Sequence, residues 1–287
     1  MNTKFKIIEC PRDAMQGLSH FVATEDKIAY LNLLLQVGFD TLDFGSFVSP
    51  KAIPQMADTE KIVDKLELSS SDTKLLAIVA NGRGVENACS FPSISYLGFP
   101  LSISETFQQR NTNASIQNGL EVVKMALEKC ARSNKELVVY LSMAFGNPYG
   151  DAYSEQTVLD FTGKLQEMGT KIISLADTVG LASKKQVYQL GKAVSAFAQG
   201  TEIGMHLHAR PETSLQKIEA AWKAGIRRLD VALGGLGGCP MAEDELVGNI
   251  STESLLVWTK GNQEISLQWN HEALSEASRF LQERILA

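Results

Sequence analysis

Short apolar runs alternate with longer amphipathic segments along almost the whole chain. In residues 24–37, for example, Ile28, Leu31 and Leu35 recur at helical spacing and Gly38 ends the pattern. The apolar runs predict strands over 6–10, 41–44, 75–80, 95–101, 137–144, 171–176, 202–208 and 228–233. The amphipathic segments predict helices over 24–37, 60–66, 83–89, 115–132, 154–168, 183–198 and 211–224.

About eight strand–helix units in roughly 250 residues predict an α/β fold, a TIM (β/α)8 barrel. A doubly wound open sheet is the alternative, but the first turn lacks a Gly-x-Gly-x-x-Gly motif. We expect one catalytic domain over 1–287, with the barrel over about 5–256 and a helical segment over about 257–287. Residues 270–285 form an amphipathic pattern that would pack on the barrel or on a partner subunit, and we expect a homodimer.

Composition excludes several classes of partner. The 287 residues are 44% hydrophobic and 21% charged, which is typical of a globular protein. A net charge of -6 without a basic run argues against nucleic acid and against a membrane surface as partners. The cysteines (Cys10, Cys89, Cys130 and Cys239) have no paired spacing, and no signal peptide or membrane-spanning stretch is evident. A reducing cytoplasm is therefore expected.

Polar residues follow nearly every predicted strand. The loops after the strands of a TIM barrel build its active site, so these residues should gather at one end. They are Arg12, Asp13, Gln16, Asp43, Ser46, Asn81, Ser142, Asn147, Asp177, Thr178, His206, His208, Cys239 and Asn249. Each also has an ordinary interpretation: Arg12 and Asp13 could form a surface ion pair, and Asp177 could cap a helix.

His206 and His208 suggest a metal site. They alternate at the end of an apolar strand, so both imidazoles point to the same side. With Asp13 and Asn249 they would offer one carboxylate, two imidazoles and an amide oxygen, a set that suits Mg²⁺, Mn²⁺ or Zn²⁺. Such an ion could also hold two oxygens of one substrate, which favours carbon–carbon bond chemistry beside a carbonyl. Arg12 is placed to stabilise an enolate.

Five motifs, in this order along the chain, resemble those of the 3-hydroxy-3-methylglutaryl-CoA (HMG-CoA) lyases, which are metal-dependent enzymes built on a TIM barrel. They are Pro11-Arg12-Asp13-Ala14-Met15-Gln16, Ser46-Phe47-Val48-Ser49-Pro50-Lys51 with Pro54-Gln55-Met56, Ala176-Asp177-Thr178-Val179-Gly180, His206-Leu207-His208 and Gly235-Leu236-Gly237-Gly238-Cys239-Pro240. The resemblance runs from about Ile7 to about Leu256. The Ser-Phe-Val-Ser-Pro and Gly-Gly-Cys-Pro stretches are specific to the lyases, whereas the other motifs include elements shared with acyl-condensing relatives.

The resemblance implies cleavage of HMG-CoA to acetoacetate and acetyl-CoA, with an acyl-CoA as the small-molecule partner. It implies that Mg²⁺ or Mn²⁺ is bound by Asp13, His206, His208 and Asn249. It also implies that Arg12 contacts the thioester carbonyl, and Gln16, Asn81, Ser142 and Thr178 are further candidates for substrate binding. Arg12, Asp43, His206 and Cys239 are the candidate catalytic residues.

Two roles stay open at this point. Because a metal-bound imidazole nitrogen cannot also act as a base, the base is the other nitrogen of His206, a water or Asp43. Cys239 either shuttles a proton or orders its loop.

The chain departs from the family pattern in three places. Asp43 stands where lyases usually carry Glu, Ala209-Arg210-Pro211-Glu212 replaces an acceptor after the second histidine, and Glu243-Asp244-Glu245 makes the loop after Cys239 acidic. These changes leave the acyl chain of the substrate open. Two alternatives remain, namely an enzyme that condenses acetyl-CoA with a 2-oxo acid, and a lyase-like barrel with altered acyl-CoA specificity or without turnover.

Overall fold

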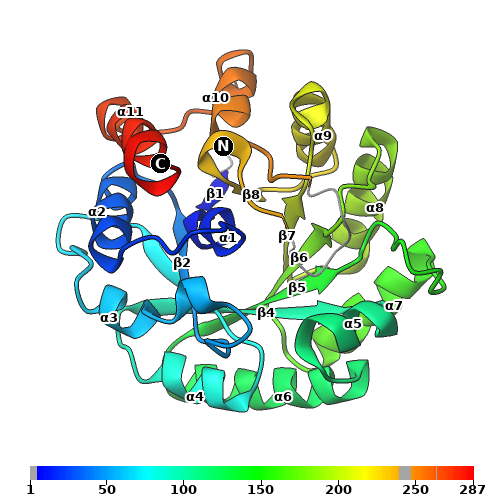
Figure 1. The fold of residues 1–287 in the computed structure, drawn as a ribbon. Coiled ribbons are helices and arrows are strands. Elements are labelled where there is room, and N and C mark those ends of the chain that lie inside the picture. The colour runs from blue at the N-terminus through cyan, green and yellow to red at the C-terminus, as the bar shows by residue number, and fades with distance from the viewer. Residues whose placement is uncertain (1–4, 239–246, 263) are drawn as a thin grey trace.

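Eight parallel strands close into a barrel, with β1 beside both β2 and β8 (Figure 1). A computed structural model of the chain describes residues 5–238, 247–262 and 264–287. The strands are β1 (Lys6–Glu9), β2 (Thr41–Ser46), β3 (Lys74–Ile78), β4 (Ile94–Ser102), β5 (Glu136–Ser142), β6 (Ile172–Asp177), β7 (Glu202–Leu207) and β8 (Arg228–Val231). The predicted TIM barrel is confirmed, and the open doubly wound sheet is excluded.

Helices surround the barrel on all sides (Figure 1). They are α1 (Pro11–Gln16), α2 (Thr24–Leu35), α3 (Thr59–Val63), α4 (Gly82–Cys89), α5 (Glu105–Thr112), α6 (Ile116–Arg132), α7 (Glu155–Glu167), α8 (Lys184–Phe197), α9 (Pro211–Lys223), α10 (Thr252–Lys260) and α11 (His271–Phe280), with short turns η1 (Pro54–Met56), η2 (Leu233–Gly235) and η3 (Leu281–Ile285). No helix within the described ranges is long and apolar enough to cross a membrane.

Local sequence signals explain where the long helices begin and where the chain turns back. The hydroxyls of Ser115, Ser154 and Ser183 each accept a hydrogen bond from the backbone N–H three residues on, which caps α6, α7 and α8. Gly38 and Gly225 follow helices with φ of +94°. Only glycine adopts that conformation without strain, so it ends the helix and redirects the chain into the next strand.

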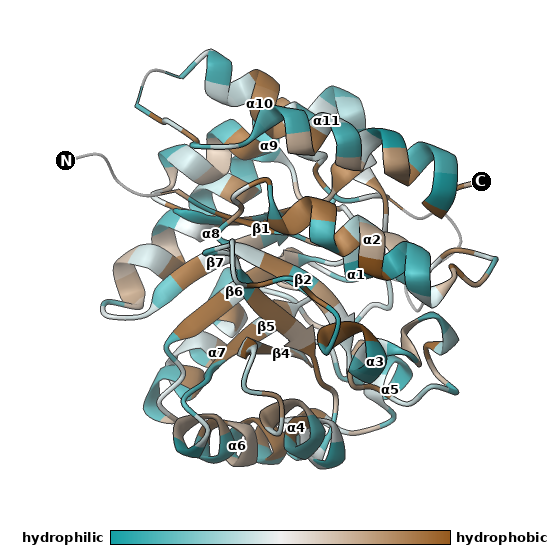
Figure 2. Cartoon of the chain, turned by 90° about the vertical axis from the view of Figure 1, so that its left-hand side faces the viewer, coloured by the Kyte–Doolittle hydropathy of each residue, from teal (hydrophilic) through white to brown (hydrophobic). Residues whose placement is uncertain are grey.

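The apolar core has two parts. The larger part fills the space between the strands and the helices, whereas a smaller cluster of Leu76, Tyr96, Val138, Tyr140 and Ile172 lies apart from it. Figure 2 shows apolar strands inside a shell of helices whose outer faces are largely polar. The strands are buried on both sides, as expected for a parallel sheet, so the site is carried on a rigid frame.

The C-terminal helical segment packs on its own barrel. Helix α11 lies beside α2, at the left of Figure 1, and the rings of Tyr30 and Phe280 stack with centroids 6.4 Å apart. Leu274, Ala277 and Leu281 are buried there. The sequence left two packing partners open for this segment, the barrel and a partner subunit. In the structure the segment packs on its own barrel.

Candidate active site

The predicted site residues meet at the end of the barrel where the strands finish. Helix α1 follows β1 after a single residue and brings Arg12 and Asp13 to this end. His206 lies near the end of β7, and His208 follows the strand and forms an isolated bridge with Asn249. Three distant parts of the sequence therefore meet at this end, as expected for a barrel whose site lies after the strands.

Asp13, His206 and His208 converge closely enough to hold one cation. One ligand atom from each lies within 4.8 Å of the others, and the Nε2 atoms of the two histidines are 3.2 Å apart. Asn249 Nδ2 donates to Asp13 Oδ2 at 2.6 Å, and Asn249 Oδ1 is buried without a hydrogen-bond partner in the described part of the chain. This orphaned oxygen and the facing nitrogens fit a divalent ion with mixed oxygen and nitrogen ligands.

Electrostatics favour the ligand forms of Asp13 and His208. Burial opposes a charge on Asp13, but Arg12, His206 and His208 outweigh it and hold its pKa below the usual value. Burial and the neighbouring His206 lower the pKa of His208 to about 3. Asp13 is therefore an anion and His208 a neutral imidazole near pH 7, which are the states that bind metals.

A carboxylate on the adjacent strand holds His206. Its Nδ1 lies 3.0 Å from Asp230 Oδ2, and a hydrogen donated by Nδ1 leaves the lone pair on Nε2, facing His208. Cys10, His206 and Asp230 form a second group with metal-ligand spacing. However, burial raises the pKa of the Cys10 thiol well above its usual value, and Asp230 already occupies Nδ1. The group around Asp13 is the better metal site.

Arg12 is held rigidly beside this cluster. Its Nη2 and Nε bind the Asp43 carboxylate, with Nη2 to Oδ2 at 2.5 Å, and its Nη1 donates to Asp13 Oδ1 and Gln16 Oε1, both at 2.9 Å. Burial lowers the pKa of Arg12 less than the two carboxylates raise it, so the guanidinium stays charged. Burial raises the pKa of Asp43 to about 6 although Arg12 opposes this. Asp43 binds the side of the Arg12 guanidinium that faces away from the cavity and so fixes its orientation.

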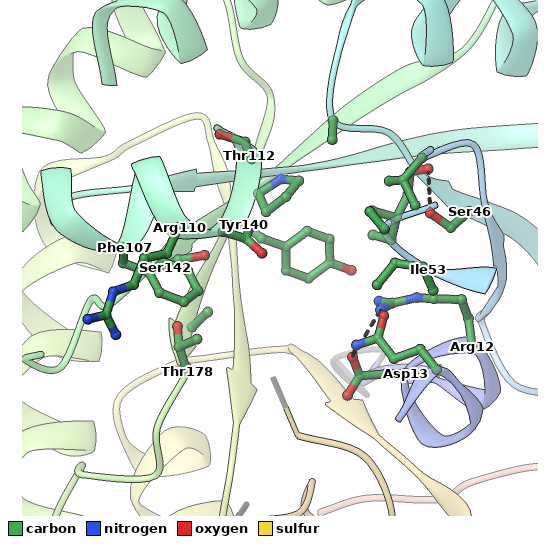
Figure 3. A pocket seen from close by; sticks show the side chains of 18 of the residues that line it. Arg12, Asp13, Ser46, Ile53, Phe107, Arg110, Thr112, Tyr140, Ser142 and Thr178 are labelled. Atoms are coloured by element: carbon green, nitrogen blue, oxygen red, sulfur yellow. Dashed lines mark hydrogen bonds and ion pairs between the residues drawn. The ribbon is translucent and has the colours of Figure 1, made fainter. Parts of the chain in front are cut away.

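A cavity of about 430 Å³ is bordered by part of this cluster, namely Arg12, Asp13, Gln16, His206 and His208 (Figure 3). Figure 3 places Tyr140 in its middle, between Arg12 on one side and Phe107 and Arg110 of α5 on the other. The five candidate substrate-binding residues, Arg12, Gln16, Asn81, Ser142 and Thr178, all line it, and Val48, Ile53 and Ile78 add an apolar wall. A ligand with both polar and apolar parts fits this lining.

Some polar residues at the strand ends make structural hydrogen bonds within the barrel. Asn81 Oδ1 accepts from Gly84 N and caps α4, and Thr178 Oγ1 accepts from Met143 N. Asp177 accepts from Lys217 Nζ at 2.8 Å, and the same Nζ donates to the His208 carbonyl oxygen at 2.6 Å. Lys217 and Asp230 did not figure among the predicted site residues. Inward alternation along β8 could have indicated Asp230, whereas Lys217 carries no local signal.

The backbone of the glycine-rich loop after β8 lies in close contact with Asp13 and Asn249. Gly237 has φ of +96°, and a Cβ there would lie 2.5 Å from Asn249 Nδ2 and 2.6 Å from Asp13 Oδ2. Glycine is thus required both by conformation and by space. Cys239 and the acidic run 243–245 lie outside the described residues.

Comparisons with known proteins show which family the chain resembles over its whole length. A family model described as HMGL-like matches residues 4–281. A hydroxymethylglutaryl-CoA lyase of Bacillus subtilis is 32% identical over 275 residues, which are 96% of this chain and 91% of the relative. A 3-hydroxy-3-isohexenylglutaryl-CoA/hydroxy-methylglutaryl-CoA lyase of Pseudomonas aeruginosa is 31% identical over 90% of this chain and 85% of the relative. A solved HMG-CoA lyase from Acinetobacter baumannii, in complex with coenzyme A and 3-methylmalate, matches with a TM-score of 0.91 at 29% identity, over 99% of this chain and 92% of that chain.

Proposed function

Because the chain belongs to the HMGL-like family, we propose that it is a metal-dependent carbon–carbon lyase that cleaves HMG-CoA to acetyl-CoA and acetoacetate. The observation that carries this proposal is the position of Arg12, which lies in the cavity wall beside the Asp13 and histidine cluster. A guanidinium next to a cation site can stabilise the negative charge that develops when a carbon–carbon bond beside a thioester carbonyl is cleaved.

The proposed metal is Mg²⁺ or Mn²⁺, with Zn²⁺ as a further possibility from the ligand set. Asp13, His206, His208 and Asn249 would hold it, and when bound it would ease loss of the proton from the substrate hydroxyl. The buried Asn249 Oδ1, which has no hydrogen-bond partner among the described residues, and the neutral His208 support this assignment.

Arg12 is proposed to stabilise the negative charge that develops on the thioester oxygen when the carbon–carbon bond breaks. Asp43 and Gln16 fix the plane of its guanidinium before substrate arrives, so little reorganisation is needed during the reaction. Asp43 contacts Arg12 from behind and is not among the residues lining the cavity. This argues for Asp43 as a positioning residue and against Asp43 as the base.

The proton acceptor is proposed to be a water in the cavity. The other candidate was the second nitrogen of His206, but that atom, Nδ1, is 3.0 Å from Asp230 and is engaged there. Of the three candidates that the sequence left open, His206 Nδ1 is engaged with Asp230 and Asp43 with Arg12, which favours a water. The role of Cys239 stays a prediction, to be tested directly.

Acetoacetate release from HMG-CoA tests the proposal. The protein is stripped with a chelator and assayed before and after Mg²⁺ or Mn²⁺ is restored, together with His206→Ala and Cys239→Ala. His271→Ala is the matched control, because His271 begins α11, is exposed and is not among the residues lining the cavity. We expect metal-dependent cleavage in the wild type and the control, and none in His206→Ala. Folded, metal-loaded wild type without cleavage would contradict the proposal.

Product assays with other substrates separate the alternatives. Product formation only from acetyl-CoA and a 2-oxo acid would indicate a condensing enzyme, and turnover only of another hydroxyacyl-CoA would indicate altered specificity. The Pseudomonas aeruginosa relative, named for a 3-isohexenylglutaryl substrate as well, makes a longer 3-alkyl group the first variation to test. The expected homodimer and cytoplasmic location stay predictions.

A further inference from the structure

The loop between β2 and α3 carries one wall of the cavity. Val48, Ala52 and Ile53 of this loop line the cavity, and Figure 3 shows Ile53 on the same side as Arg12. Apart from the short turn η1, the loop contains no helix or strand, and its own backbone contacts are few, such as Ile53 N to Ser49 O at 3.0 Å. A loop of this kind keeps its position only where neighbouring elements hold it.

Gln55 connects this loop to the segment that follows α1. Its side chain is buried, its Oε1 accepts from Val22 N at 3.0 Å, and its Nε2 donates to the His20 carbonyl oxygen at 2.8 Å. The Gln55 carbonyl oxygen also accepts a hydrogen bond from Lys27 Nζ of α2. Both polar atoms of the side chain and the backbone carbonyl are thus bonded to residues 20–27, and Gln55 itself is not among the residues lining the cavity.

A buried ion pair strengthens the same connection. Lys27 Nζ lies 2.9 and 3.0 Å from the two carboxylate oxygens of Asp58, and Thr24 Oγ1 donates to Asp58 Oδ2 at 2.8 Å. Lys27 has no exposed surface, and Asp58 is buried at the end of the loop. Because separation of the pair would leave two buried charges uncompensated, the end of the loop is held in one position relative to α2.

We propose that Lys27, Gln55 and Asp58 form a loop anchor, a set of positioning residues that holds the apolar wall of the cavity in place for the substrate. The anchor joins the loop after β2 to the chain that follows α1, and α1 carries Arg12 and Asp13. The position of the wall relative to these two charged residues is therefore set by contacts that lie outside the cavity.

The inference rests on the proposed function, because it assigns the wall to one part of the substrate. The hydroxyl and carboxylate oxygens of a 3-hydroxyacyl-CoA suit the cation cluster and Arg12. The alkyl group on carbon 3 has no polar atom, so its surface is best removed from water against Val48 and Ile53. None of the three anchor residues lines the cavity, so they act only through the loop.

Loss of the loop anchor should weaken substrate binding and spare the chemical step. Arg12 has its own partners in Asp43 and Asp13, so it stays in place when the loop moves. The alkyl group makes the same contact with the wall before and during bond cleavage, and loss of such a contact raises KM and leaves kcat unchanged. Because one methyl group in an apolar pocket is worth about 10-fold in binding, KM should rise by about that factor.

Steady-state kinetics with HMG-CoA and amide hydrogen exchange, both on the full chain loaded with Mg²⁺ or Mn²⁺, test the inference. Lys27→Met and Gln55→Ala should each raise KM by about 10-fold at unchanged kcat. Both should also speed exchange over residues 48–56, which reports the position of the loop without any turnover. Lys135→Met is the matched control, because Lys135 is also buried, donates to the Phe91 and Ile94 carbonyl oxygens at 2.6 and 2.7 Å, and does not line the cavity. It should keep the wild-type KM and the wild-type exchange over residues 48–56.

Several outcomes would overturn the inference. Wild-type exchange over residues 48–56 in the folded variants would show that the anchor does not hold the loop. Faster exchange with an unchanged KM, or a fall in kcat at constant KM, would show that the loop does not act through substrate binding. A wild type that cleaves no HMG-CoA would remove the proposed function and this role together, whereas hydrogen exchange would still decide whether the anchor holds the loop. Should Lys27→Met fail to fold, Gln55→Ala decides, because it keeps the buried ion pair.

Discussion

Replacement of Gly237 by alanine should abolish metal binding while leaving the fold intact. The added Cβ would lie 2.5 Å from Asn249 Nδ2, 2.6 Å from Asp13 Oδ2 and 3.1 Å from the Asp13 carbonyl oxygen. Carbon atoms do not approach polar atoms so closely, so one or both ligands must shift by several tenths of an ångström. Metal–ligand distances tolerate a displacement of only about 0.2 Å, so these two residues could not bind as proposed.

The magnitude has two parts that can be separated. A non-glycine residue at φ of +96° costs about 1 to 2 kcal/mol of backbone strain. Displacement of two ligands should exceed the upper range for a lost supporting contact, about 100-fold in metal affinity. Gly169 offers a matched control, because its φ is +93° and nothing lies within 4 Å of the corresponding Cβ. Gly169→Ala carries the same strain without the clash.

Calorimetry with Mn²⁺ and thermal unfolding of the metal-free proteins provide the measurements. Both variants should lose similar stability without metal, and only Gly237→Ala should lose Mn²⁺ affinity, by more than about 100-fold, which corresponds to about 2.8 kcal/mol. Equal Mn²⁺ affinity in the two variants would refute the reasoning, because it would mean that Asp13 and Asn249 are not both ligands.

Three further predictions follow from buried charges. Asp13→Asn should lower Mn²⁺ affinity by at least about 100-fold with little change in unfolding temperature, since Asn249 can still contact the amide; unchanged calorimetric affinity would contradict it. Lys27→Met should destabilise the protein by about 3 kcal/mol in urea unfolding, because it leaves the Asp58 carboxylate buried without its cation; a loss below about 1 kcal/mol would contradict it. Burial raises the pKa of Glu9 to about 8, so its contribution to stability is complete below pH about 4.5 and is lost as pH rises toward 8. Glu9→Gln should therefore reduce the fall in unfolding free energy between pH 5 and 8, and an unchanged slope would contradict this.

The strands were predictable because each is a short apolar run buried on both faces. Helix α1 was missed because it has only six residues and begins with Pro11, and α5 because Phe107 is its only large apolar residue. Neither offers the repeated apolar spacing that indicates a helix. The barrel itself could be inferred from the number of units, since closure needs only their count and order.

The ligand cluster could also be predicted from the sequence. Alternation on a strand places His206 and His208 on one side, and the barrel brings Asp13 to the same end. The residues that hold the ligands in position could not be predicted from the sequence. Asp230 meets His206 because β7 and β8 pair with these two residues in register, and Lys217 reaches Asp177 across forty positions of sequence. Register and long-range side-chain contacts depend on packing that no local pattern encodes.

The unusual segment after His208 now has a physical interpretation. Its sequence lacks the expected acceptor, yet His208 is held from its backbone, because Lys217 Nζ donates to its carbonyl oxygen and Ala209 N donates to the Gly248 carbonyl oxygen at 2.9 Å. Asp177 in turn neutralises Lys217. A side chain at position 209 is thus not needed to place this ligand. The proposed ligand His208 is then held by the buried Lys217–Asp177 pair, and substitutions in this pair should affect metal affinity more than substitutions at position 209.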